Sequence, residues 1–83
     1  MNQIVEIRTI ALNIKNLRLS RNMTQFDMGD LLGYSDRQIR RLEKEGTMNI
    51  EVVNLIAKVF NIPVESILFK QDAFYILGVV GFL

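Results

Sequence analysis

The sequence predicts an all-α protein built from five short helices. Apolar residues recur every three or four positions along most of the chain, which is the spacing of one face of a helix. Residues that cap or end helices stand between these apolar runs. The chain has 83 residues, enough for a single domain, and so small a domain needs a compact core.

The first predicted helix covers residues 7–21. We expect it to stop at Asn22, because asparagine tolerates the left-handed backbone conformation that follows many helices. The stripe that this helix turns toward the core falls at helical spacing on Ile7, Ile10, Ile14 and Leu17.

The second predicted helix covers residues 25–32. Thr24 caps its start with a side-chain oxygen, and Asp27 in the first turn is attracted by the positive end of the helix. Gly33 breaks the helix, and the small residue Gly29 allows a neighbouring helix to cross closely. These features predict a tight turn into a third helix.

The third predicted helix begins at Ser35 and runs to residue 45, where Gly46 ends it. Gln38 lies three positions after Ser35, as a capping box requires. The net charge of the chain is only +1, and a basic run alone equally fits a solvated helix face. Its place in a helix pair joined by a tight turn favours DNA binding. The four bases on the outward side are Arg37, Arg40, Arg41 and Lys44.

Two further helices complete the predicted domain. Asn49 caps the fourth helix. Its inward positions are Ile50, Val53, Ile56, Ala57 and Phe60. Pro63 opens a short fifth helix over residues 64–69, because proline is tolerated in the first turn of a helix.

The composition argues against catalysis and against a metal centre. Cysteine and histidine are both absent from the chain. Disulfides, thiolate metal sites and the commonest catalytic bases and nucleophiles are therefore missing. The serines and carboxylates show no spacing typical of a catalytic triad or an acid pair. We expect no enzymatic activity and no cofactor.

Neither end of the sequence reads as a targeting signal. The first ten residues lack the basic start and apolar block of a secretory signal. Residues 73–83 are apolar throughout, but a helix of that length spans roughly 16 Å. This is about half of the ~30 Å hydrocarbon core of a bilayer. We expect a cytoplasmic protein with no membrane span.

Several of these elements recur together at fixed spacing. They are Ile14-Lys-Asn-Leu-Arg18, Met23-Thr-Gln25, Met28-Gly29, Leu32-Gly-Tyr-Ser35, Ile39-x-x-Leu42-Glu43, Gly46, Ile56-Ala57 and Ile62-Pro-Val-Glu-Ser-Ile-Leu68. Residues 10–69 thereby resemble the phage-repressor and Cro-like helix-turn-helix family, also called the XRE family. The resemblance implies a compact five-helix, lambda-repressor-like domain that binds operator DNA as a homodimer and regulates transcription. It leaves residues 1–9 as a lead and residues 70–83 as an apolar tail.

The resemblance also implies roles for individual residues. Base reading in the major groove is expected from Asp36, Arg37 and Arg41. Arginine can clamp guanine O6 and N7, and aspartate can accept from cytosine N4. Phosphate contacts, which set the register without reading sequence, are expected from Gln25, Ser35, Arg40, Lys44 and Thr47.

Four residues have two interpretations. We favour helix capping over base reading for Gln38, and a core position over base stacking for Tyr34. Arg18 and Glu43 fall where members of the family hold an internal ion pair. We favour that structural role over a DNA contact, because breaking one side of such a pair is costly.

Some apolar residues exceed what the core of this domain needs, and large exposed apolar patches mark interaction surfaces. Phe26 and Leu31 fall on the outward side of the second helix. Leu12 and Leu19 add a second apolar line to the first helix. The fourth helix carries another line at Val52, Leu55 and Val59.

The tail, residues 73–83, is rich in aromatic and β-branched residues, which favours a β-strand. Residues 3–9 are a candidate partner strand. We hypothesise that the tail and the second face of the fourth helix form a homodimer interface, or that the tail folds back onto its own domain. The alternative is an end that stays free or touches a membrane. The candidate dimerisation residues are Val52, Leu55, Val59, Phe74, Ile76 and Val79.

Two functions from different classes follow. The leading hypothesis is a sequence-specific repressor or activator that reads a palindromic operator as a homodimer, with the third helix in the major groove. The second is an antitoxin-like or antirepressor module that captures a protein partner with its tail and apolar surfaces. The basic third helix favours the first function, and the surplus apolar residues favour the second.

Overall fold

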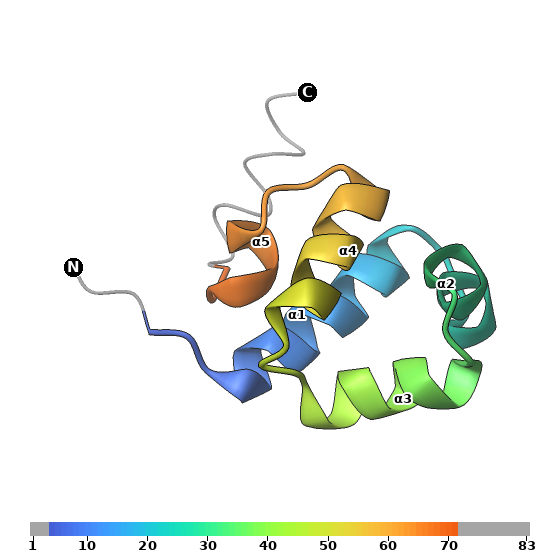
Figure 1. Ribbon diagram of the computed structural model, residues 1–83, viewed down its shortest axis with the longest axis horizontal. Helices are drawn as coiled ribbons and strands as arrows, with labels where there is room; N and C mark the ends of the chain where they lie inside the picture. The colour runs from blue at the N-terminus through green and yellow to red at the C-terminus, as the bar shows by residue number, and fades with distance from the viewer. Residues whose placement is uncertain (1–3, 72–83) are drawn as a thin grey trace.

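Five helices make up most of the computed structural model, which describes residues 4–71. They are α1 (Ile7–Ser20), α2 (Gln25–Leu32), α3 (Asp36–Glu45), α4 (Ile50–Phe60) and α5 (Glu65–Leu68). In Figure 1, α1 runs behind α4 through the middle of the molecule, and α2, α3 and α5 surround this pair. The described residues contain no strand, and the prediction of an all-α protein with five helices is confirmed. The candidate strand in the tail, with Phe74, Ile76 and Val79, lies outside the described residues.

Asparagines end two of the helices. Asn22 follows α1 with φ 56°, and Asn61 follows α4 with φ 55°. After Asn22, the Met23 N–H reaches back and donates to the Arg18 carbonyl oxygen at 3.2 Å. The residue after Asn61 makes the same kind of bond at the end of α4. These bonds satisfy carbonyl groups that a helix end leaves open, and the predicted stop at Asn22 is confirmed.

All five helices contribute apolar side chains to one core. The buried residues are Ile10, Ile14, Met28, Leu32, Ile39, Val53, Ile56, Ala57, Phe60 and Ile67. Between residues 4 and 71, no polar or charged residue is buried as a whole. Removal of this apolar surface from water is the main favourable term in folding. Since every helix supplies part of the core, each depends on the others for its place.

Two residues that the spacing predicts to point inward do not. Ile7 is 43% exposed and Ile50 is 55% exposed. Each is the first residue of its helix. Side chains on a helix tilt toward its N-terminus, so the first one projects past the end of the packed region. Helical spacing identifies a face correctly but does not show where the packing along that face stops.

The prediction of a second, surplus face on α4 is also wrong in part. Val52 and Leu55 are half-buried and pack against the core. α4 contacts both α2 and α5, so its buried surface is wider than a single stripe. Only Val59 of that line is exposed. The surplus residues of α1 and α2 are exposed as predicted: Leu12, Leu19, Phe26 and Leu31.

Helix α5 is shorter than predicted and is attached to α1 by a side chain. It covers Glu65–Leu68 rather than residues 64–69. The Asn13 amide nitrogen donates to the Ile67 carbonyl at 2.9 Å and to the Phe69 carbonyl at 2.8 Å. These bonds hold the chain against α1 as it leaves α5. Within residues 4–71, every helix falls short of the length and hydropathy that crossing a membrane requires.

Candidate nucleic-acid interface

A tight turn joins α2 to α3, and its shape depends on two glycines. Gly33 ends α2 with φ 80°, in the left-handed region. The Tyr34 N–H then donates to the Gly29 carbonyl at 2.8 Å. A β-carbon on Gly29 would collide with the Tyr34 carbonyl oxygen. Because only glycine permits so close an approach, these two positions set how α3 crosses α2.

Both helices begin with a complete capping box. In α2, the Thr24 hydroxyl accepts from the Asp27 N–H, and the Asp27 carboxylate accepts from the Thr24 N–H, each at 3.0 Å. Hydrogen bonds from the Thr24 backbone and hydroxyl lower the pKa of Asp27 below its usual range. In α3, Ser35 and Gln38 exchange the same pair of bonds at 3.1 and 2.8 Å. The predicted caps are confirmed, and the Gln38 side-chain carbonyl is engaged in its cap.

The inward side of α3 is held by an ion pair with α1. Arg18 Nε donates to Glu43 Oε2 at 2.5 Å, and a second guanidinium nitrogen donates to Oε1 at 3.1 Å. The two side chains are only 11% and 5% exposed. The hydrogen bonds to Glu43 raise the pKa of Arg18. Two parallel bonds fix a direction as well as a distance, so the pair orients α3 relative to α1.

Gln25, the first residue of α2, also reaches Glu43. Its Nε2 donates to Glu43 Oε1 at 3.2 Å, and the side chain is half-buried. A glutamine amide nitrogen carries two N–H donors, and this bond uses one of them. The structure therefore places the expected phosphate-binding residue at the junction of α2 and α3, with its amide held in position.

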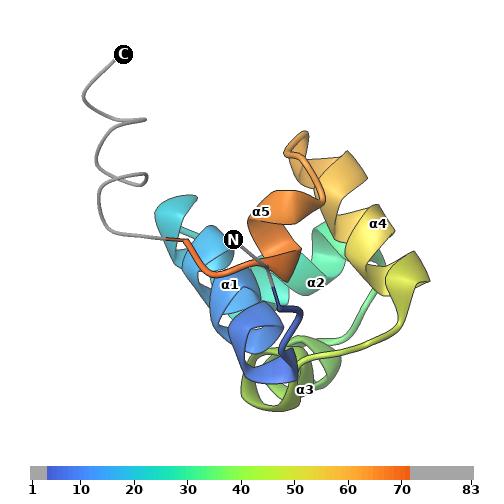
Figure 2. The ribbon, with the colours of Figure 1, turned by 90° about the vertical axis from the view of Figure 1, so that its left-hand side faces the viewer.

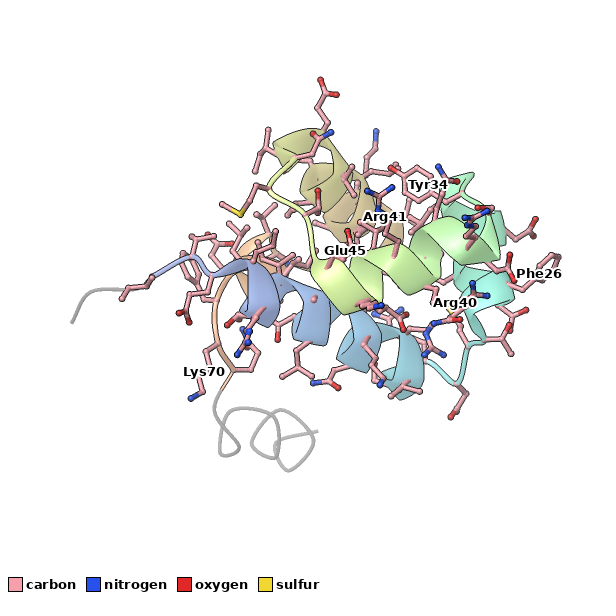
Figure 3. All side chains as sticks on the ribbon, turned by 90° about the horizontal axis from the view of Figure 1, so that it is seen from below. Phe26, Tyr34, Arg40, Arg41, Glu45 and Lys70 are labelled. Carbon is pink, nitrogen blue, oxygen red and sulfur yellow. The ribbon has the colours of Figure 1, made fainter. Side chains whose placement is uncertain are left out.

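The outward side of α3 faces solvent. Figure 3 looks at this side, with Arg41 and Glu45 along one edge of the helix and Arg40 along the other. Six charged side chains are exposed here: Asp36, Arg37, Arg40, Arg41, Lys44 and Glu45. Four bases and two acids leave an excess of positive charge on this surface. All three residues expected to read bases are on it.

Two of these bases pair with acids on α3 itself. Arg41 Nε donates to Glu45 Oε1 at 3.2 Å, and an Arg40 nitrogen lies 3.7 Å from an Asp36 oxygen. More than half of each side chain is exposed, so these pairs contribute little to stability. Sequence reasoning missed both partners. The four-residue spacing of opposite charges is the signal that identifies them.

Residues expected to contact phosphates border both ends of α3. Ser35 precedes the helix, and Lys44 lies in its last turn. Thr47 follows in the loop to α4, where its hydroxyl accepts from the Asn49 N–H at 3.0 Å. A hydroxyl that accepts one bond still has its own hydrogen to donate. Both hydroxyls are therefore chemically suited to a phosphate oxygen.

A hollow of about 350 Å³ lies beside α3, toward α4. Its wall includes Arg41 and Glu45 from α3, Thr47 from the loop and Val52 from α4. Tyr34 also borders it and is half-buried against the core, in agreement with the prediction for this residue. The hollow leaves room beside the Arg41 side chain.

The comparisons with known proteins agree with this geometry. A family profile described as helix-turn-helix matches residues 14–67, which run from α1 into α5 and make up more than half of the chain. Comparisons with curated proteins and with solved structures gave no match. Proteins of the matched family bind DNA and regulate transcription, and they are not typically enzymes. The chain belongs to the phage-repressor and Cro-like (XRE) family of helix-turn-helix DNA-binding proteins.

Proposed function

We propose that the protein is a transcriptional repressor that binds a palindromic operator as a homodimer. The observation that carries this proposal is the division of α3 into two sides. Its inward side is anchored through Glu43, and its outward side exposes Arg37 and Arg41. A helix held this firmly presents its outward side chains in a fixed orientation, as reading base edges requires.

Base reading falls to three residues near the start and middle of α3. Arg37 and Arg41 are one helical turn apart, which separates them by roughly 6 Å along the axis. Each guanidinium can donate two bonds to guanine O6 and N7 of a different base pair. Asp36 supplies an acceptor for cytosine N4.

Phosphate contacts position the helix in the groove. Four of the residues proposed for this role lie around the ends of α2 and α3, and Arg40 lies at the middle of α3. DNA strands pass on either side of a helix that lies in the major groove. The proposed residues carry cationic, amide or hydroxyl donors, which phosphate oxygens accept. They are Gln25, Ser35, Arg40, Lys44 and Thr47.

Two copies of the chain give the specificity that one copy lacks. A single module of this size covers only about 600–1,000 Å² of its own surface on DNA. A two-fold symmetric dimer places two α3 helices in successive major grooves, about 34 Å apart, and so recognises a palindrome. Repression then follows from occupancy of the operator, with no further contact needed. This function places the protein in the cytoplasm, beside the DNA.

A protein-interaction role is the second candidate, and exposed apolar side chains favour it. Phe26 of α2 is 68% exposed and points away from the molecule in Figure 3. Leu12, Leu19 and Leu31 are also exposed. An antitoxin-like or antirepressor protein holds its partner with surfaces of this kind. The two functions are compatible, because these residues lie outside the outward side of α3.

Selection of bound sites from random duplex DNA tests the leading proposal. We expect enrichment of an inverted repeat whose half-sites are about ten base pairs apart, centre to centre. The selection is run at two salt concentrations, since phosphate contacts make affinity fall steeply with salt. Retention of random sequences with no enriched motif would contradict sequence-specific binding. Enrichment of a single half-site would support sequence-specific DNA binding but contradict the homodimer.

A further inference from the structure

Exposed apolar side chains gather at the end of the molecule where the residues before α1 meet the start of α4. Five of the ten large apolar side chains exposed within residues 4–71 are found here. Two segments supply them, residues 4–7 and residues 48–50. They meet where Ile7 lies against Gly46, two residues before Met48. We call this surface the lead patch; its members are Ile4, Val5, Ile7, Met48 and Ile50.

The lead patch borders a cleft of about 230 Å³. Val5, Met48 and Ile50 line this cleft, and the buried residues Ile10 and Val53 form its floor. Its wall is almost entirely apolar. Its floor belongs to the core and Thr47 at its edge is a proposed phosphate contact, but the exposed, uncharged side chains of Val5, Met48 and Ile50 belong neither to the core nor to the proposed DNA interface. An apolar cleft of this kind is stabilised by an apolar occupant.

The sequence contains a segment of matching chemistry a few residues after the cleft residue Leu68. Residues 73–83 read Ala-Phe-Tyr-Ile-Leu-Gly-Val-Val-Gly-Phe-Leu and contain no charged residue. Leu68 of α5 lines the cleft, and Ala73 follows it by five residues. Even a fully extended link of that length spans only about 17 Å. The segment therefore starts within reach of the cleft.

The described chain runs from α5 to the same end of the molecule as the cleft. Asn13 holds the carbonyls on both sides of Leu68, so the link leaves from a fixed point on α1. Figure 2 shows residues 4–6 close to the segment that leaves α5, in agreement with Val5 and Leu68 sharing the cleft wall. Figure 3 shows Lys70 at the end where α1 begins.

We propose that residues 73–83 dock in this cleft of their own domain. A short link keeps the segment at a millimolar effective concentration near the cleft, whereas a second copy arrives only at the concentration of the protein. Docking removes the lead patch and the apolar tail from water together. The proposal concerns the isolated protein and does not depend on DNA binding, so either can fail without the other.

A single introduced thiol tests the proposal, because the chain contains no cysteine. Ile50→Cys is placed in the full chain, and its reaction rate with a small thiol reagent is measured. The same variant carrying Phe74→Ser, Ile76→Ser and Val79→Ser provides the comparison. We expect a roughly tenfold slower reaction with the natural tail, as for a cleft open about a tenth of the time. Circular dichroism verifies that both proteins are folded, and Met48→Cys repeats the measurement at a second wall position.

Leu19→Cys is the matched control, because Leu19 is an equally exposed leucine on α1 outside the cleft. Its rate is expected to be the same with either tail. Equal rates at Ile50→Cys and Met48→Cys with the two tails would overturn the proposal, as would slowing at Leu19→Cys alone. Slowing at the cleft that appears only in concentrated protein would overturn it too, since the occupant would then be the tail of a second copy.

Discussion

Arg18 of α1 and Glu43 of α3 face each other through two parallel hydrogen bonds in a place that water hardly reaches. The same carboxylate accepts from Gln25 of α2. The Glu43 side chain is thus hydrogen-bonded to both α1 and α2, the two helices against which α3 packs. The orientation of α3 depends on charged groups as well as on the apolar core.

Removing one partner of this pair is expected to destabilise the fold strongly. Arg18→Met leaves the Glu43 carboxylate buried without its cation, which costs about 3–5 kcal/mol of unfolding free energy. Urea titration measures the loss. The double variant Arg18→Met, Glu43→Leu should recover most of it, since no buried charge remains. A double variant as unstable as the sum of the single losses would show that the pair has no special coupling.

Base-reading residues and phosphate-contacting residues are expected to differ when each is replaced. Arg37→Ala and Arg41→Ala should each cost about 1–3 kcal/mol of binding to the selected operator and relax specificity at one base pair. Lys44→Ala should weaken binding to all sequences alike and reduce the salt slope by about one. Gel-shift titrations on the operator and on single-base variants distinguish these effects. Uniform weakening by all three substitutions would place the arginines on phosphates.

The acid partner of Arg41 is expected to oppose DNA binding. Glu45→Gln removes an exposed i, i+4 pair worth about 0.3–0.5 kcal/mol and also removes a charge that phosphates repel. Operator affinity should therefore rise by a few-fold, most clearly at low salt. Glu65→Gln on α5 makes the same charge change away from α3 and serves as the control. Equal gains from both substitutions would point to net charge rather than to the pair.

Two glycines in the turn between α2 and α3 are expected to respond differently to alanine. Gly29→Ala forces a β-carbon against the Tyr34 carbonyl, a backbone group that cannot move alone, and should cost about 3 kcal/mol or more. Gly33 has open space around it and only a positive φ, so Gly33→Ala should cost about 1–2 kcal/mol. Denaturant midpoints of the two variants give the order. The reverse order would mean that the α2–α3 crossing is looser than the contact at Gly29 implies.

Acid should weaken the start of α2. The Thr24 backbone N–H and hydroxyl lower the pKa of Asp27, so folding favours its charged form. This contribution to stability is complete above the pKa of the unfolded chain and is lost as the pH falls through the lower pKa of the folded state. Asp27→Asn should therefore flatten the acid side of the stability curve, measured by urea titration at successive pH values. An unchanged acid slope would assign that slope to other carboxylates.

Local features of the sequence predicted the helix boundaries well. Caps depend on a residue and its neighbours within four positions, as for Thr24 with Asp27 and Ser35 with Gln38. The stop at Asn22 is equally local. The family resemblance supplied Arg18 with Glu43, a contact between residues far apart in the sequence. Spacing within one helix contains no information on such contacts.

Features that depend on the limits of packing could not be predicted in the same way. Ile50 lies on the correct face of α4 but at its first residue, beyond the core. Val52 appeared surplus because the sequence does not reveal how many neighbours cover α4. The four-residue spacing of Arg41 and Glu45 indicates their pairing, but neither interpretation of the basic run, as a DNA-binding surface or as a solvated helix face, takes the acids of α3 into account.

The residues that seat α3 and the residues proposed to meet the operator are different residues. Ile39, Glu43 and the Ser35–Gln38 cap stabilise the helix from within, whereas Asp36, Arg37 and Arg41 contribute nothing to the core. Exchanging the latter three therefore leaves the scaffold intact. Under the proposed function, point mutations at these three positions change the recognised DNA sequence while the helix keeps its anchoring contacts.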